Sequence, residues 1–400
     1  KRPKLRFPGF DEPWKENELS HYLVENTERN RGLAFGKEDV LSVSGEYGVI
    51  NQIAFQGRSF AGESVADYHV VETDDIVYTK SPLKANPYGI IKVNKGIPGI
   101  VSTLYAVYHP LNTVAPRFVD LYFANDLRLN KFLKPLVNIG AKHDMKVNNS
   151  FVLTGTVVFP SIGEQQKLVD FFAKLDRRIE AQRKIVDTLK KYKRGVMQRI
   201  FRNMSVVLPS GFETVKLSAI FKKVSRRNNK SEIKNVITNS AEYGLIPQRD
   251  FFDKDIAVDG NTSNYYVIEQ GDFVYNPRKS NTAPYGPFNR YEREERGIIS
   301  PLYTCLVLQA DIEPSYLAWY FKSDAWYRYI YDNGSQGVRH DRVSMTDDLL
   351  MGIPVIIPSK EAQLKIAKLL DCLESRFQTE LSQYESLKSI RVALLQQLFI

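Results

Sequence analysis

The sequence has few of the residues that build disulfide frameworks and none of the long apolar runs that cross membranes. Its 400 residues include 2 cysteines, too few for a disulfide framework or a thiolate zinc site, so we expect a reducing cytoplasm. The longest apolar stretch, residues 349–358, is far shorter than the roughly 18 residues that a membrane-spanning helix needs. The N-terminal segment is basic and polar and lacks the apolar region of a signal peptide. We therefore expect a soluble, unexported protein without a membrane partner.

Length and charge indicate a multidomain protein with an anionic partner. The length allows two or three domains of about 150 residues. The hydrophobic fraction of 43% and the charged fraction of 25% exclude a disordered or fibrous chain. Lys and Arg number 55 against 46 Asp and Glu, so the formal net charge is +9. This charge favours an anionic partner, and nucleic acid is the first candidate.

The chain contains two copies of one sequence pattern. The segment SGEYGVINQ at 44–52 returns as SAEYGLIPQ at 240–248, an offset of 196 residues (240 − 44). Other matches follow in the same order at offsets of 197 (284 − 87) and 198 (297 − 99): PYG at 87–89 and 284–286, GIVSTLY at 99–105 and GIISPLY at 297–303, GAKHD at 140–144 and GVRHD at 337–341. A nearly constant offset along the chain indicates an internal duplication with small loop changes.

Each copy predicts a β-rich part followed by a long helix. In the first part, β-branched and aromatic residues are broken by Gly, Pro, Asn and Asp, which predicts strands and loops. We expect a curved mixed sheet there with short helices, including one at 118–132 and its counterpart at 316–331. The second part, 164–202 and 361–399, has no Pro, almost no Gly and a preceding Pro-Ser, as a helix would. The predicted α+β organisation is a β-rich domain at 1–160, a helix at 161–204, a β-rich domain at 205–358 and a helix at 359–400.

The two predicted helices, each about 60 Å long, carry a heptad repeat. Eight of the ten a and d positions in each helix are apolar, starting from Leu168 and Ile366. The polar exceptions fall at equivalent places, which are Gln182 and Lys193 in the first helix and Glu380 and Arg391 in the second. Because a buried charge is costly unless it is paired, we predict an antiparallel coiled coil in which Lys193 faces Glu380 and Gln182 faces Arg391.

Two β-rich domains, each followed by a helix of an antiparallel coiled coil, resemble the DNA sequence-specificity subunit of type I restriction-modification enzymes. The resemblance covers the whole chain. It includes the opening PKLRFPGF at 3–10 with Trp14, the run DIVY at 75–78, PYGII at 87–91 and STLY at 102–105, and the second copy GDFVYN at 271–276 and SPLY at 300–303. In that family each β-rich domain is a target-recognition domain that reads one half of a bipartite DNA site. The helices space the two halves and dock the methyltransferase subunits.

The resemblance implies a non-catalytic subunit of a cytoplasmic, DNA-associated complex in a bacterium or archaeon. Its partners would be double-stranded DNA, two methyltransferase subunits, and restriction or translocase subunits. S-adenosylmethionine, ATP and Mg would be bound by those partner subunits, and this chain would bind no cofactor. Because the two β-rich domains differ in detail, the two half-sites should differ and the complete site should be asymmetric.

The sequence itself carries no complete catalytic motif. The segment NPYG at 86–89 lacks the second proline of the amino-methyltransferase motif, and GLAFGK at 32–37 has three residues between its glycines where a phosphate-binding loop needs four.

Two other classes of protein stay open as alternatives to a specificity subunit. One is a protein-interaction scaffold with two binding heads, which the net charge and the repeated basic loops argue against. The other is a self-contained nuclease, which would cleave DNA alone with a divalent metal.

The repeated GAKHD and GVRHD loops are the first candidates for DNA contact. They contain or adjoin Lys142 and His143 in the first repeat, and Arg339, His340 and Arg342 in the second. Arg can bond bidentately to guanine O6 and N7, and both Lys and Arg bind phosphate. His-Asp adjacency alone supplies neither a nucleophile nor metal-ligand spacing. The alternative is a solvated loop whose Asp pairs with the basic residue beside it.

A second pair of candidate segments mixes basic, amide and aromatic residues. Its members are Lys80, Lys84, Asn86 and Tyr88 in the first repeat, and Asn276, Arg278, Lys279, Asn281 and Tyr285 in the second. Amides can read adenine, and cations can bind phosphate. Tyr78 and Tyr275 are better explained as core residues. Tyr47 and Tyr243 precede a glycine in a shared turn, where we favour fixing the turn over touching DNA.

Overall fold

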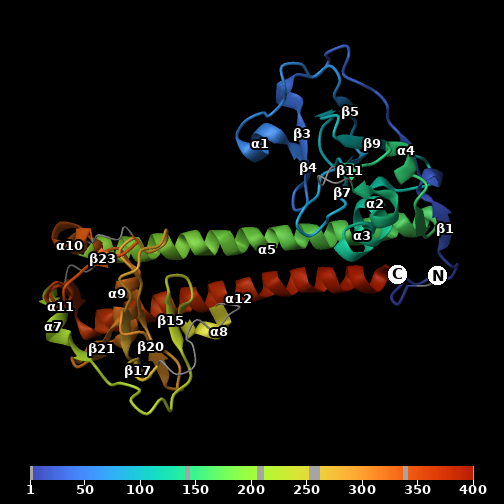
Figure 1. The fold of residues 1–400 in the computed structure, drawn as a ribbon. Helices are drawn as coiled ribbons and strands as arrows, with labels where there is room; N and C mark the ends of the chain where they lie inside the picture. Colours follow the sequence, from blue (N-terminus) through green and yellow to red (C-terminus); the bar gives the residue numbers. More distant parts are fainter. Residues whose placement is uncertain (1–2, 140–144, 205–210, 252–261, 337–340, 400) are drawn as a thin grey trace. The chain divides into compact units, whose positions relative to one another are not determined.

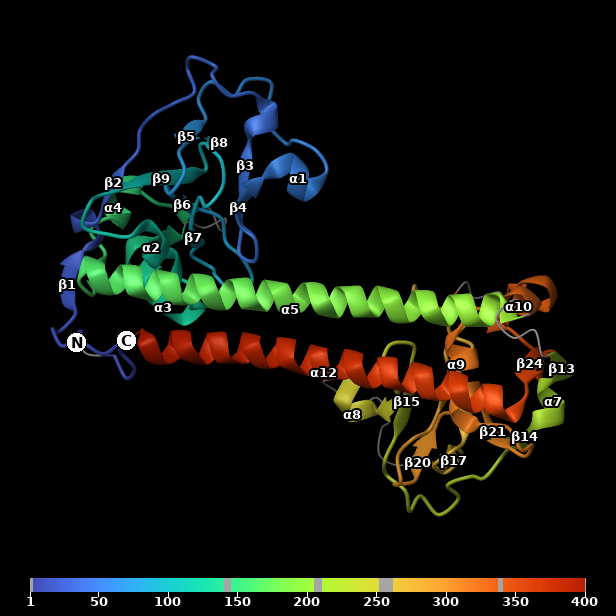
Figure 2. The same cartoon turned by 180° about the vertical axis from the view of Figure 1, so that it is seen from behind.

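The computed structural model describes residues 3–139, 145–204, 211–251, 262–336 and 341–399 (Figures 1 and 2). The chain divides into two compact units. Unit 1 consists of Lys1–Arg183 and Gln383–Ile400, and unit 2 of Lys184–Ser382. Each unit therefore combines one β-rich domain with a part of both long helices. Among the described residues, no helix has an apolar stretch that could cross a bilayer.

The first β-rich domain, in unit 1, is built from short strands and helices. Its strands are β1 (Lys15–Glu18), β2 (Leu23–Glu25), β3 (Leu41–Ser44), β4 (Gly48–Asn51), β5 (His69–Val71), β6 (Ile76–Thr79), β7 (Ile90–Val93), β8 (Gly99–Val101), β9 (Tyr105–Pro110), β10 (Asn138–Ile139), β11 (Met145–Lys146) and β12 (Thr156–Phe159). Its helices are α1 (Gln52–Gln56), α2 (Pro116–Tyr122), α3 (Asp126–Leu133) and α4 (Asn149–Val152), and α5 (Ile162–Arg202) follows. The largest sheet has the antiparallel order β2-β9-β6-β7.

The second β-rich domain, in unit 2, repeats this plan. Its strands are β13 (Phe212–Lys216), β14 (Phe221–Val224), β15 (Ile237–Ser240), β16 (Gly244–Pro247), β17 (Tyr266–Ile268), β18 (Phe273–Tyr275), β19 (Phe288–Arg290), β20 (Gly297–Ile299), β21 (Thr304–Leu308), β22 (Ser335–Gln336), β23 (Val343–Ser344) and β24 (Pro354–Pro358). Its helices are α7 (Leu217–Ile220), α8 (Gln248–Phe251), α9 (Pro314–Lys322), α10 (Tyr327–Asn333) and α11 (Asp347–Met351), and α12 (Lys360–Leu398) follows. The sheet β14-β21-β18-β19 corresponds to β2-β9-β6-β7, so the duplication of sequence is a duplication of fold.

The interior of each domain differs in two details from what we expected. The named strands pair antiparallel in several small sheets rather than in one mixed sheet, because turns interrupt the chain every few residues. The single helix expected at 118–132 is the pair α2 and α3, and that at 316–331 is the pair α9 and α10. In unit 1 the break has a local cause, since the Asn125 side chain accepts a hydrogen bond from the backbone N–H of Arg128 and caps α3.

The end of each long helix lies in the core of the other repeat's domain. In unit 1, Phe399 follows α12 and its ring packs 5.7 Å from Phe118 of α2 and 6.0 Å from Trp14. In unit 2, Phe201 near the end of α5 lies 5.8 Å from Tyr316 and 5.6 Å from Tyr320, both on α9. Each buried aromatic side chain stabilises its core by about 2 kcal/mol or more. Neither β-rich domain is therefore complete without the helix of the other repeat.

Buried glutamines fix the start of each long helix to its domain. The Gln165 side chain accepts from the backbone N–H of Ala115 (2.9 Å) and donates to the carbonyl oxygen of Pro160 (3.0 Å). Gln363 of α12 bonds in the same way, accepting from Glu313 N–H (2.8 Å) and donating to Pro358 O (2.8 Å). Because the partners are backbone atoms, this anchor holds whatever side chains surround it.

The a and d positions of the predicted heptad are buried or half-buried in both α5 and α12. The two cations among them find carboxylates on the other helix. In unit 2, Lys193 pairs with Glu374, and in unit 1, Arg391 Nε lies 2.5 Å from Asp176 Oδ1. The two pairs are equivalent under the internal repeat, since both members are shifted by 198 residues (391 − 193 and 374 − 176).

Both cations have a different partner from the one we predicted. Glu374 replaces the predicted Glu380, and Asp176 replaces the predicted Gln182, a shift of six residues in each case (380 − 374 and 182 − 176). In both units the partner lies six residues N-terminal of the predicted one, so α5 and α12 pair in a register shifted from the predicted one. The heptad pattern locates the paired faces of the two helices but not the register between them.

Reversing one charge of the Lys193–Glu374 pair should destabilise the protein, and reversing both should restore it. The two side chains are 21% and 29% exposed, so solvent screens them only in part. We expect Glu374→Lys to lower the free energy of unfolding in urea by about 1 kcal/mol. The double variant Lys193→Glu/Glu374→Lys should recover most of this loss. Additive losses in the double variant would contradict the pairing.

Candidate nucleic-acid interface

In unit 2 the structure brings the two candidate segments of the second repeat together. The segment that follows β18 runs beside the β22–β23 hairpin. The backbone N–H of Lys279 donates to the carbonyl oxygen of Asp341 (2.8 Å), and that of Val343 donates to Pro277 O (2.9 Å). An isolated antiparallel bridge joins Arg278 to Arg342. Two segments far apart in the sequence thus form one surface.

Two guanidinium groups share one carboxylate on this surface. Asp341 Oδ2 lies 3.5 Å from Arg278 Nε and 3.9 Å from Arg342 Nε. The Arg278 side chain is nevertheless 67% exposed, and that of Arg342 is 33% exposed. The alternative that the loop Asp pairs with its basic neighbour therefore holds for Asp341 and Arg342, but the pairing leaves both cations open to solvent. Such cations can contact phosphate oxygens or guanine edges.

A cavity of about 240 Å³ in unit 2 involves the same two segments. Its lining includes Pro277, Tyr303 and Val343. Burial raises the pKa of the Tyr303 hydroxyl, and the nearby charges of Arg278 and Arg342 act in the opposite direction. A protonated hydroxyl can donate or accept a hydrogen bond. Sequence reasoning missed Tyr303, because nothing in its own segment shows that it faces these arginines.

The segment carrying Arg278 is held in place by buried neighbours. Asn276, which we predicted as a DNA contact, is buried: its Oδ1 accepts from Arg278 N–H (3.0 Å) and its Nδ2 donates to Asn239 O (3.2 Å). Its amide is used to position the backbone and does not reach the surface. The Tyr275 hydroxyl donates to Tyr285 O (2.8 Å), which closes the loop between them. Of the other predicted residues here, Asn281 is exposed, whereas Lys279 and Tyr285 are half-buried.

The first repeat has the same loop closure with different residues. The Tyr78 hydroxyl donates to Tyr88 O (2.7 Å), as Tyr275 does to Tyr285. The predicted contact Asn86 is buried and its Nδ2 donates to Asp126 Oδ1 (3.0 Å), so it too serves the fold. Lys84 is exposed and Tyr88 is half-buried. In this segment Lys84 is the predicted cation that is most open to solvent.

Lys80 belongs to a partly buried polar cluster. Its Nζ donates to Asn149 Oδ1 (3.1 Å), and Asn149 Nδ2 donates to Glu25 Oε1 (2.9 Å). Burial, reinforced by the charge of Arg29, lowers the pKa of Lys80. Burial also lowers the pKa of the neighbouring His69 to about 4, and the charges of Arg29 and Lys80 add to this effect. The cluster is held from within unit 1, so Lys80 is less available to a ligand than Lys84.

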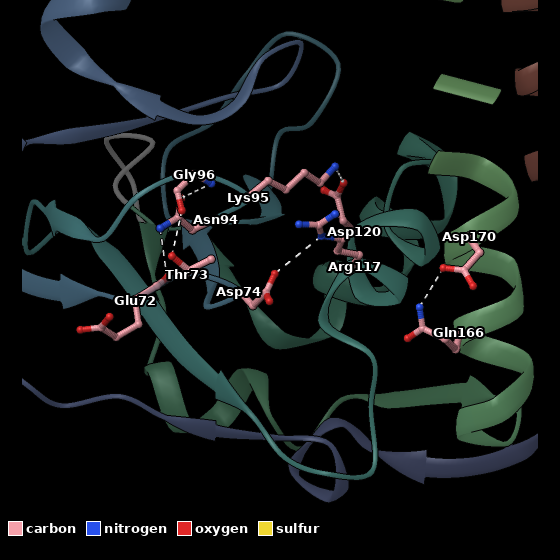
Figure 3. Close-up of polar contacts among 10 residues, drawn as sticks. All are labelled: Glu72, Thr73, Asp74, Asn94, Lys95, Gly96, Arg117, Asp120, Gln166 and Asp170. Carbon is pink, nitrogen blue, oxygen red and sulfur yellow. Dashed lines mark hydrogen bonds and ion pairs between the residues drawn. The ribbon is translucent and has the colours of Figure 1, made fainter. Parts of the chain in front are cut away.

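Other basic residues of unit 1 are engaged by carboxylates (Figure 3). Lys95 Nζ lies 2.5 Å from Asp120 Oδ2, and Arg117 Nε lies 3.7 Å from Asp74 Oδ1. The Asn94 side chain ties the adjoining turns together by donating to the carbonyl oxygens of Glu72 and Ile97. These contacts connect α2 to the turns after β5 and β7. Lys95 and Arg117 are nevertheless 54% and 51% exposed, so their pairing, like that of Arg278, leaves them accessible to solvent.

The two repeats share the frame of these loops but not their tips. Counting from Tyr78 and Tyr275, Ser81 occupies the place of Arg278, and Lys84 that of Asn281 (278 − 81 and 281 − 84 both give 197). The predicted contacts Lys142, His143, Arg339 and His340 lie outside the described residues. Within the described residues, no group of three or more His, Cys, Asp or Glu side chains could hold a metal ion.

The fold is that of known specificity subunits. The S subunit of a type I restriction-modification system from M. genitalium matches 100% of this chain and 99% of its own, at a TM-score of 0.55 and 14% identity. A chain from a type I R-M system, solved to explain complex assembly and conformational transition, matches 98% of this chain and 99% of its own, at a TM-score of 0.52 and 15% identity. No family model and no curated protein sequence matches this chain. The chain thus has the fold of the type I S subunits.

Replacing Gly286 should disrupt the loop that carries Arg278. This residue has a φ of +85°, and a Cβ there would lie 1.9 Å from the carbonyl oxygen of Asn276. Gly271 has a similar φ of +92° but nothing within 4 Å of its Cβ position, so Gly271→Ala measures the cost of backbone conformation alone, about 1–2 kcal/mol. We expect Gly286→Ala to lower the free energy of unfolding by about 2 kcal/mol more than Gly271→Ala does, because the new Cβ also meets the carbonyl oxygen. Equal losses would contradict the close contact.

The buried His69 should make the protein less stable in acid. Its pKa is about 4 when folded, against an ordinary value of 6.5. Between pH 6.5 and pH 4 the His69 imidazole binds a proton in the unfolded chain but not in the folded one. The free energy of unfolding is therefore highest above pH 6.5 and falls as the pH is lowered toward 4. In urea unfolding at pH 7 and pH 5, the wild-type protein should lose more stability than His69→Gln. Equal losses would contradict the assignment.

Proposed function

We propose that this chain is the non-catalytic specificity subunit of a type I restriction-modification complex. The observation that carries the proposal is the surface of Arg278, Lys279, Asp341 and Arg342, where two segments of one repeat bring together an exposed arginine, Arg278, and two half-buried cations. The fold similarity supports it. The net charge of +9 is also that expected of a chain with a nucleic-acid partner.

Each β-rich domain would read one half of a bipartite DNA site. A guanidinium held at a fixed place can bond to guanine O6 and N7, and Arg278 and Arg342 are candidates for this role in the second half-site. The first domain has Ser81 in the place of Arg278 and so cannot make the same contact. Two similar frames with different tips favour two different half-sites, and hence an asymmetric complete site.

The long helices would form one antiparallel coiled coil that sets the spacing between the half-sites. They would also dock the methyltransferase subunits, of which we propose two because the chain contains two equivalent repeats. Restriction or translocase subunits would complete the assembly. We assign S-adenosylmethionine, ATP and Mg to these partner subunits, and we place the complex on DNA in the cytoplasm.

Removing the two arginines should change what the complex methylates. We would map adenine methylation at single-base resolution in cells carrying this chain and its methyltransferase subunit, and compare the Arg278→Ala/Arg342→Ala variant. Loss of a bidentate contact to guanine costs about 1–3 kcal/mol of discrimination. We therefore expect methylation of cognate sites to fall about tenfold or more, or to spread to sites altered in one half only.

Arg328→Ala is the matched control, because this arginine of the same domain is 81% exposed and pairs with Asp332 of its own helix. It should leave the methylated motif unchanged. If no methylation depends on this chain, the proposed function is wrong and the interaction scaffold becomes the better account. If the double variant methylates the same motif as the wild type, the chain reads DNA elsewhere.

A further inference from the structure

The Ser-x-Glu-Tyr-Gly turn is built in the same way in both repeats. In unit 1 it joins β3 to β4, and the Ser44 hydroxyl oxygen accepts from the backbone N–H groups of Glu46 (3.3 Å) and Tyr47 (3.2 Å). In unit 2 it joins β15 to β16, and Ser240 makes the same two bonds at 3.2 Å each. Gly48 and Gly244 both have a φ of +73°, which favours glycine. The serine and the glycine therefore form the turn.

The tyrosine side chain of this turn is largely exposed in both repeats. Tyr47 is 59% exposed and Tyr243 is 61% exposed, so both rings point away from the core. Large aromatic side chains on a rigid turn bury much surface on binding with little loss of conformational freedom, which makes them frequent anchors of interfaces.

In unit 1 the tyrosine ring packs on another exposed aromatic ring, since the Tyr47 and Phe55 rings lie 5.6 Å apart. The segment that follows the turn carries further exposed apolar side chains, and Ile53, Phe55 and Phe60 are 38%, 41% and 54% exposed. The Arg58 guanidinium lies 4.5 Å over the Phe60 ring. We call Tyr47, Ile53, Phe55, Arg58 and Phe60 the turn patch. Aromatic residues with arginine, and few other charges, are the composition of the centre of a protein–protein interface.

Two observations favour a protein over DNA as the ligand of this turn. First, the turn has the same Ser-x-Glu-Tyr-Gly residues and bonds in both repeats, whereas the loop that carries Arg278 in the second repeat carries Ser81 in the first. A turn conserved between the repeats suits a partner that binds both repeats as identical copies. Second, the residue before each tyrosine is an exposed glutamate, Glu46 or Glu242, which would repel a phosphate backbone. A protein–DNA interface is, by contrast, strongly positive.

We propose that the Tyr47 and Tyr243 turns each dock one copy of the same protein partner. The inference rests on the proposed function, which makes that partner the methyltransferase subunit. Each copy would accept the tyrosine ring in an apolar pocket and face the neighbouring glutamate with a basic or N–H donor group. The two turns would then give the assembly two equivalent contacts, while the arginine-bearing loops remain free to differ.

The test measures binding of the purified methyltransferase subunit to the full chain by sedimentation and by titration calorimetry. Tyr47→Ala should weaken one of two binding events about tenfold or more, Tyr243→Ala the other, and the double variant both. Tyr47→Phe should bind as the wild type does, because the ring rather than the hydroxyl is buried. Tyr331→Ala is the control, since Tyr331 is a 69% exposed tyrosine that lies outside both turns.

A second pair of variants distinguishes the ligands. Glu46→Lys and Glu242→Lys should weaken methyltransferase binding and leave the affinity of the assembled complex for DNA unchanged. Tighter DNA binding by these variants, with normal assembly, would assign the turn to DNA and overturn the proposal. If the wild-type chain binds no methyltransferase subunit, the proposed function fails. If it does bind and the tyrosine variants bind equally well, this inference alone fails.

Discussion

The reciprocal burial of Phe399 and Phe201 is the contact on which both units depend. Each aromatic ring comes from the helix of one repeat and completes the core of the other repeat's domain. A helix of about 60 Å with an apolar seam cannot bury that seam alone, and a domain of short strands has an open face where the ring belongs. Packing the end of each helix in the other repeat's domain buries both surfaces. The Lys193–Glu374 and Arg391–Asp176 pairs add one ion pair between α5 and α12 in each unit.

Within each domain, several of the bonds that hold the loops and the starts of the long helices end on backbone atoms. The hydroxyls of Tyr78 and Tyr275 donate to carbonyl oxygens, and the Gln165 and Gln363 side chains bond to N–H groups and carbonyls. A frame of this kind does not depend on the side chains at the loop tips. That separation explains how two domains with one architecture can carry an arginine in one case and a serine in the other.

Features that depend on periodicity and repetition could be predicted from the sequence. The heptad positions are buried or half-buried, and the repeated motifs occupy equivalent strands and turns. Helix register and the burial of polar side chains could not. The partners of Lys193 and Arg391 were missed because a seven-residue repeat is compatible with several registers between two helices. Asn276 and Asn86 have the composition of a binding residue, but only the three-dimensional structure shows that their amides are buried and used for local bonds.

The packing of each helix end in the other repeat's domain also determines the order in which the two domains can finish folding during translation. Phe399 follows the whole second repeat in the sequence, so the ribosome synthesises it after the second β-rich domain. The first domain leaves the ribosome early but has to wait for the last helix before Trp14 and Phe118 are covered. The second domain, whose Phe201 precedes it, has its ring available from the start. The half that is translated first is therefore the half that is finished last, and its apolar face must be kept from other nascent chains until then.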